Sequence, residues 1–167
     1  KKTKIIFEKI KKLGKKFKIT YSGMHALDTL RLEKKFLHWG HDITSENNPF
    51  ESGLSFAVNF KKDEDFIGRE SLEKIKDKPL KNKLELFSLK GKFKPGKPLL
   101  LHDEPIYKDN KIIGFTTSSN FSFCYDKNIC LAYVKSELID DKGLFIEVEG
   151  KKYPLHLEKN PIHDPTS

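Results

Sequence analysis

The spacing of apolar residues changes near the middle of this chain, and this change restricts the fold more than any other feature of the sequence. Before residue 76 most of the apolar residues recur at helical intervals, whereas beyond residue 83 they alternate with polar ones. The stretch between them, 76–83, is polar and has a central Pro, which is typical of a linker. The sequence therefore predicts two domains, 1–78 and 79–167, and an α+β fold.

The second domain is predicted to be an antiparallel β unit, either a small barrel or a sandwich. Two short sequences favour hairpin turns, Asp109-Asn110 and Glu149-Gly150-Lys151. The predicted strands are 83–89, 111–117, 129–135, 144–149 and 152–157.

The first domain is predicted to be mainly helical. A helix is expected over 3–17, and Ser22 is expected to cap a second helix. An alternating run predicts a strand over 54–60, and a short helix is predicted over 69–76. The apolar stripe of the first helix consists of Ile6, Ile10, Leu13 and Phe17.

The net charge of +8 is concentrated at one end of the chain. Residues 1–18 contain nine lysines and one glutamate, and the rest of the chain has equal numbers of basic and acidic side chains. Because the excess is not spread over a binding face, nucleic acid is not expected as a partner. We expect the lysines to lie on the solvated face of a helix that packs over a core. A basic helix that binds a membrane surface, an acidic partner or nucleic acid is the alternative.

Several other classes of protein and site are excluded by composition. No apolar run approaches the roughly 20 residues that a membrane span needs, and no export signal is visible. Two cysteines are too few for a disulfide framework, so a cytoplasmic protein is predicted. Cys124 and Cys130 lack the second pair of ligands that structural zinc requires. A loop with His38, His41 and Asp42 lacks a fourth ligand, and no metal site is predicted.

The scarcity of arginine points to candidate binding residues. Only Arg31 and Arg69 occur among 32 basic residues, so each is expected where a flat guanidinium is needed rather than a point charge. Arg31 precedes Glu33 on the same predicted helix and lies eight residues before Trp39. These three side chains can bind a flat heteroaromatic ligand with an acidic tail. The alternative is an intramolecular ion pair of Arg31 and a core position for Trp39.

Several motifs in one order make the chain similar to a known family. These are GMHALDTLRLEK at 23–34, HWGHD at 38–42, NPFESGL at 48–54, DFIGRESL at 65–72, KIIGFTTS at 111–118 and LAYV at 131–134. Together they resemble the glycine-cleavage T-protein (aminomethyltransferase) superfamily. The form of these motifs in this chain, with Trp39, looks most like the folate-binding region of dimethylglycine and sarcosine dehydrogenases.

The resemblance implies a fold and a reaction. The expected fold is part of a split α/β (ferredoxin-like) unit followed by the T-protein C-terminal barrel. The expected cofactor is tetrahydrofolate, which captures a one-carbon unit as 5,10-methylenetetrahydrofolate. FAD would belong to an N-terminal flavin and folate domain outside this chain, joined to it in cis or as a separate subunit. We accordingly expect this chain to be a C-terminal piece that is inactive alone.

The resemblance also implies roles for individual residues. Arg31 is expected beside the bound folate, where it contacts either the cofactor or an organising carboxylate. Glu33 is expected to hold Arg31 in place, and Trp39 to stack on the ligand or wall the pocket. No catalytic residue is predicted within this chain.

Two alternatives to a dehydrogenase stay open at this point. Leu27 stands where the T-protein has Arg, which favours a dehydrogenase over a T-protein. An aminomethyltransferase or another folate-dependent one-carbon transferase is still an alternative. A non-catalytic interaction subunit that uses the basic N-terminal helix is an alternative of a different class.

Overall fold

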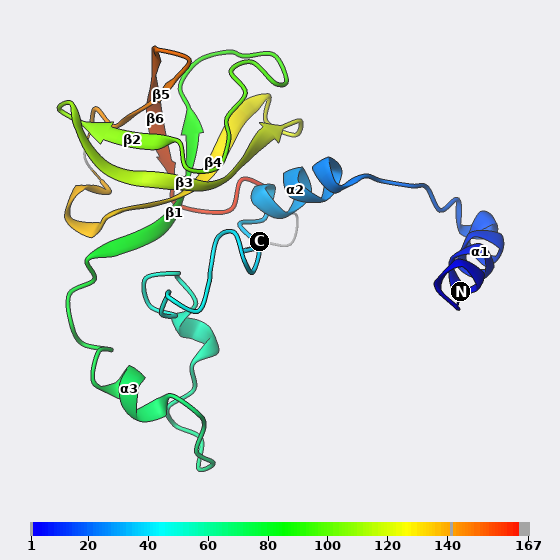
Figure 1. Cartoon of the computed structure of the whole chain (residues 1–167), viewed down its shortest axis with the longest axis horizontal. Helices are drawn as coiled ribbons and strands as arrows, with labels where there is room; N and C mark the ends of the chain where they lie inside the picture. Colours follow the sequence, from blue (N-terminus) through cyan, green and yellow to red (C-terminus); the bar gives the residue numbers. More distant parts are fainter. Residues whose placement is uncertain (1, 141, 164–167) are drawn as a thin grey trace.

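The part of the chain that the structure describes forms a closed antiparallel β-barrel preceded by three short α-helices and irregular segments (Figure 1). A computed structural model describes residues 2–140 and 142–163. The strands follow the order β1-β4-β3-β2-β5-β6 around the barrel. They are β1 (Asn82–Leu89), β2 (Pro105–Lys108), β3 (Lys111–Ser122), β4 (Lys127–Lys135), β5 (Phe145–Val148) and β6 (Lys151–Glu158). The predicted α+β class with a terminal barrel is confirmed.

The helices lie before the barrel in the sequence. They are α1 (Lys2–Gly14), α2 (Met24–Glu33) and α3 (Arg69–Glu73). The 3₁₀ turns η1 (Lys15–Phe17) and η2 (Ser55–Ala57) also precede the barrel, whereas η3 (Ser136–Leu138) lies between β4 and β5. Among the described residues, no helix has both the length and the apolar character that crossing a membrane requires.

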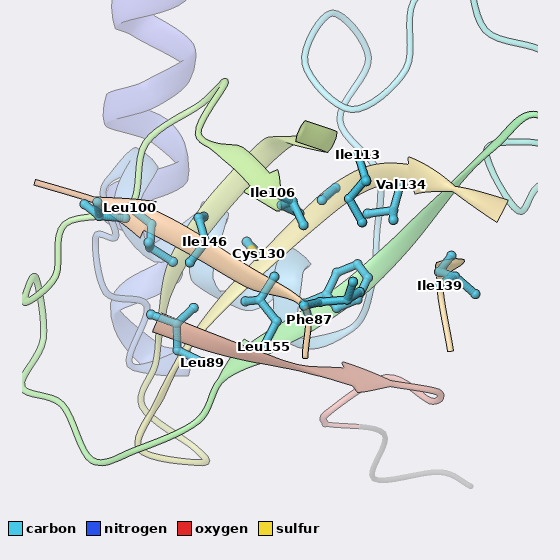
Figure 2. Close-up of a cluster of buried hydrophobic side chains, with 13 residues drawn as sticks. Phe87, Leu89, Leu100, Ile106, Ile113, Cys130, Val134, Ile139, Ile146 and Leu155 are labelled. Carbon is cyan, nitrogen blue, oxygen red and sulfur yellow. The ribbon is translucent and has the colours of Figure 1, made fainter. Parts of the chain in front are cut away.

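The interior of the barrel is filled by one apolar cluster. Figure 2 shows its side chains projecting inward from several strands, with Phe87 and Ile146 fully buried. A second, smaller cluster joins α2 to the outside of the barrel, because Leu32 packs with Leu84, Leu86, Ile129 and Leu131. Leu32 is itself fully buried, so the end of α2 is anchored on the barrel wall.

Turn chemistry accounts for two of the barrel connections. Asp109 and Asn110 both have positive φ, 47° and 63°, as a tight turn between β2 and β3 requires. Glu149 and Gly150 have φ of 51° and 72° between β5 and β6. Both turns confirm the sequence prediction.

Several local predictions for the first domain need correction. The strand predicted over 54–60 is wrong, because backbone N–H groups there bond to carbonyls three residues back and form η2. The helix predicted over 69–76 ends at Glu73. Gly23 rather than Ser22 is the N-cap of α2. Finally, the helix predicted over 3–17 ends at Gly14, and its last three residues form η1. The predicted apolar stripe does not cover the core, because it is at least half exposed, as at Ile10 (53%), and Figure 1 shows α1 standing apart from the barrel.

Candidate functional site

A cavity of about 330 Å³ lies where α2 meets β3 and the loop before β2. Its volume is near the lower end of small-molecule sites, roughly 300–1,000 Å³. Apolar side chains form part of its wall, including Met24, Leu99 and Leu101, which are all more than half exposed. Arg31, Asp28 and Ser118 supply its charged and polar groups near α2. An apolar wall with a few convergent polar groups is the usual character of a ligand site.

Arg31 projects from α2 into this cavity and is held on three sides. Its Nε donates to Asp28 Oδ1 at 3.0 Å, its Nη1 to Asp42 Oδ2 at 2.7 Å, and its Nη2 to Ser118 Oγ at 2.8 Å. The Arg31 side chain is 12% exposed, and that of Asp28 is 31% exposed. Of the two contacts expected of Arg31, the structure contains the one to a carboxylate, and it contains two. These contacts are also the intramolecular ion pair of Arg31 that the sequence left open as the alternative.

Asp42 is the most enclosed member of this group. It is 1% exposed, and besides Arg31 it accepts from the backbone N–H of His38 at 2.8 Å and from Thr117 Oγ1 at 2.6 Å. Charge-assisted hydrogen bonds of this kind compensate the cost of burying a carboxylate. The residue thus joins α2, the 38–42 turn and β3.

A β-bulge in β3 makes this junction possible. Thr116 pairs with Ala132 and Ser118 with Leu131, so Thr117 is an extra residue in the ladder with β4. Neighbouring residues of a regular strand point to opposite faces. The bulge lets both Thr117 and Ser118 reach the Arg31–Asp42 pair.

Glu33 does not hold Arg31 as expected. Its carboxylate accepts from Ser122 Oγ at 2.7 Å and from the backbone N–H of Cys124 at 3.4 Å. Two positions apart on a helix, Arg31 and Glu33 face different directions, whereas Asp28 is three residues away and shares the face of Arg31. Glu33 is 1% exposed and anchors α2 to the end of β3.

Trp39 lies outside the cavity wall. Trp39 is 67% exposed, and its backbone forms an isolated parallel bridge with that of Ile43. The prediction that Trp39 walls the pocket does not hold for this cavity, and the alternative of a core tryptophan is wrong as well.

Four histidines line the cavity: His25, His38, His41 and His102. The rings of His38 and His41 lie 4.6 Å apart, and those of His41 and His102 lie 6.0 Å apart. Within residues 2–140 and 142–163, no group of three histidine, cysteine or acidic side chains is arranged to hold a metal ion.

The sequence reasoning missed the partners that shape the site. From the sequence, Asp42 is part of a motif and a weak candidate for a metal ligand, and Thr117 and Ser118 are only part of a motif. The signal for Asp28 was present, because an acidic residue three positions before Arg31 on a helix lies beside it. No local signal connects Arg31 to Ser118, which is 87 residues away.

Family models match two parts of the chain. The GCVT N-terminal domain matches residues 1–62, and the glycine cleavage T-protein C-terminal barrel domain matches residues 85–164. The matches flank the predicted linker and agree with the position of the barrel.

Similar proteins come from several groups. Mitochondrial dimethylglycine dehydrogenase of Rattus norvegicus is 35% identical over 159 residues, which are 94% of this chain and 18% of that protein. An aminomethyltransferase of Synechococcus elongatus is 33% identical over 142 residues, which are 84% of this chain and 37% of that protein. A mitochondrial pyruvate dehydrogenase phosphatase regulatory subunit of Mus musculus is 34% identical over 138 residues, which are 83% of this chain and 16% of that protein. The chain thus spans less than two fifths of each of these relatives.

A solved structure supports the same fold. The glycine cleavage system aminomethyltransferase T of Bartonella henselae superposes with a TM-score of 0.79 at 23% identity. The superposition covers 92% of this chain and 42% of that chain. The two family models and these similarities together show that this chain belongs to the glycine-cleavage T-protein superfamily.

Proposed function

We propose that this chain contributes to a tetrahydrofolate site of the dimethylglycine or sarcosine dehydrogenase type, in which the one-carbon unit is captured as 5,10-methylenetetrahydrofolate. The observation that carries the proposal is the cavity with Arg31 at its polar end and apolar side chains along its wall. The similarity to the rat dehydrogenase, which extends over 94% of this chain, supports this type.

The residues present fit a flat, partly polar ligand. A guanidinium has five N–H donors, and the described contacts of Arg31 use three of them. Two donors, one on each Nη, are left for an acceptor on the ligand. Met24, Leu99 and Leu101 offer apolar surface for a ring. Trp39 is proposed to contact a part of the ligand that extends beyond the cavity along the 38–42 turn.

Titration with 5-formyltetrahydrofolate, an air-stable analogue, tests this proposal. Nuclear magnetic resonance shifts of the 167-residue chain follow binding even at millimolar dissociation constants. Arg31→Lys keeps the charge but loses the planar fork, so we expect at least tenfold weaker binding, about 1.4 kcal/mol.

The chain provides a matched control in its only other arginine. Arg69 bonds to Glu73 and to the carbonyls of Phe60 and Lys62, and it does not line the cavity. Arg69→Lys is expected to leave the dissociation constant unchanged. Equal affinities of the Arg31 and Arg69 variants, or shifts that map away from the cavity, would exclude the proposed site.

A second candidate function is that of an interaction subunit. The name of the mouse relative includes the words regulatory subunit. In this chain, α1 has lysines on one side and an exposed apolar stripe on the other, which fits an acidic protein surface with apolar side chains. Replacing Lys9, Lys11 and Lys12 by Gln should abolish salt-sensitive binding to immobilised polyglutamate. The same change at Lys108, Lys151 and Lys152 on the barrel should not, and equal losses would argue against a role for α1.

A further inference from the structure

The carboxylate of Asp42 is buried, fully engaged and outside the cavity wall. Its two oxygens accept from Arg31 and His38 on one side and from Thr117 on the other. Its side chain has no exposed surface. Since it cannot touch a ligand in the cavity directly, any effect of Asp42 on binding must pass through the groups that it holds.

Arg31 is the group through which such an effect can pass. Asp28 is on the same helix and contacts only Nε. The outer nitrogens are held by residues from elsewhere in the fold, Nη1 by Asp42 and Nη2 by Ser118. Asp42 is the charged one of these two outer partners, and its bond to Arg31 is the shortest of the three. It therefore contributes most to the direction in which the two remaining donors of Arg31 point.

The position of Asp42 is in turn set by the barrel. Thr117 occupies the bulge of β3 and donates to the second oxygen of Asp42. The backbone N–H of His38 closes the turn that carries Asp42. A shift of the bulge relative to α2 would thus turn the guanidinium of Arg31.

We propose that Asp42 is a positioning residue of the ligand site, which orients the free N–H donors of Arg31 by holding Nη1 from behind. This inference rests on the proposed function for its ligand, but the contact itself does not depend on a ligand. Replacing the Asp42 carboxylate by an amide is expected to weaken its hold on Nη1, because a neutral amide oxygen accepts a weaker hydrogen bond than a carboxylate. Arg31 then samples several directions and binds an acceptor less tightly.

A double-mutant cycle separates positioning from a merely structural role. The variants are Asp42→Asn, Arg31→Lys and the combination of both, each titrated with 5-formyltetrahydrofolate. We expect Asp42→Asn to weaken binding about tenfold in the wild-type background and less than twofold in the Arg31→Lys background. Equal losses in both backgrounds would overturn the proposal.

A readout without ligand makes the test independent of the folate hypothesis. The Arg31 Nε–H resonance should be resolved and slow to exchange in the wild type, because that group is hydrogen-bonded and mostly buried. It should shift and exchange faster in Asp42→Asn. If binding proves insensitive to Arg31, the proposed function fails. An unchanged Arg31 resonance in Asp42→Asn would overturn the positioning role whatever the titrations give.

Glu85→Gln is the control for loss of a buried carboxylate. Glu85 is 8% exposed, pairs with Lys35 and Lys83, and lies outside the cavity. Its neutralisation is expected to lower the melting temperature and to leave both the dissociation constant and the Arg31 resonance unchanged. A change in either readout would mean that destabilisation alone explains the effect of Asp42→Asn.

Discussion

Gly114 lies between two strands that leave no room for a side chain. It pairs with Ile106 of β2 on one side and with Val134 of β4 on the other. A Cβ at this position would lie 2.1 Å from the carbonyl oxygen of Tyr133 and 3.0 Å from Val134 Cα. These are backbone atoms, so no rotamer change relieves the clash. Gly114→Ala should therefore destabilise the whole barrel.

The magnitude follows from the separation that the methyl group would impose. Ordinary carbon–oxygen contacts begin near 3.4 Å, so β3 and β4 would have to move apart by more than about 1 Å. Overpacking of this kind costs about 1–3 kcal/mol, and each weakened ladder hydrogen bond adds about 0.5–1.5 kcal/mol. The reduced entropy of the unfolded alanine chain offsets about 0.4–1 kcal/mol. We expect a loss of about 2–4 kcal/mol in the free energy of unfolding.

Urea denaturation followed by circular dichroism measures this loss through the midpoint and the slope. Gly23→Ala is the control, because a Cβ there meets no atom within 4 Å and φ is −91°. Gly23 is the N-cap of α2, so the control should cost less than about 1 kcal/mol. A Gly114→Ala protein within 1 kcal/mol of the wild type would refute the register of β3 against β4.

Two further predictions concern titratable groups. Burial raises the pKa of Glu85, but the hydrogen bonds and charges of Lys35 and Lys83 outweigh this effect and lower that pKa below its ordinary value. We expect the wild type to be more stable than Glu85→Gln by about 1–3 kcal/mol. This difference should be complete above about pH 5 and should vanish as the pH falls through the lowered pKa of Glu85. A difference in the free energy of unfolding that stays constant down to pH 2 in urea denaturation would contradict this. The pKa of the exposed Cys124 thiol is raised by its hydrogen bond to the Glu33 carboxylate, and burial raises that of Cys130 to about 12. Ellman's reagent should therefore modify Cys124 slowly at pH 8 and Cys130 only after unfolding, whereas equal rates in the native protein would argue against the barrel core.

The parts of the fold that could be predicted correctly from the sequence depend on local sequence patterns. Period-two alternation and Asp-Asn or Glu-Gly turns identify most of the barrel strands without knowledge of their neighbours. The strand β2 escaped prediction because it has only four residues and begins with Pro105. The run 54–60 alternates like a strand, but nothing pairs with it among the described residues, and Phe56 is 84% exposed. Alternation alone cannot supply a partner strand.

The site was predictable to the extent that its residues lie close together in sequence. The rarity of arginine identified Arg31, and helical geometry connects it to Asp28. The same geometry argues against a pair between Arg31 and Glu33, two positions apart. The contact with Ser118 depends on the β3 bulge, and a bulge is a tertiary feature with no fixed sequence signature.

The net charge and the cavity are separate features of this molecule. The excess of lysine lies in residues 1–18, and Figure 1 shows α1 apart from the barrel. Apart from histidines, the charged residues that line the cavity are Arg31 and Asp28, which pair with each other. The buried Asp42 adds a second carboxylate behind the guanidinium. The positive charge of Arg31 is thus more than balanced by these two carboxylates, so recognition there depends on the direction of its remaining N–H donors rather than on electrostatic attraction. This is why the residues that orient Arg31 matter more to the site than the lysines that dominate the composition.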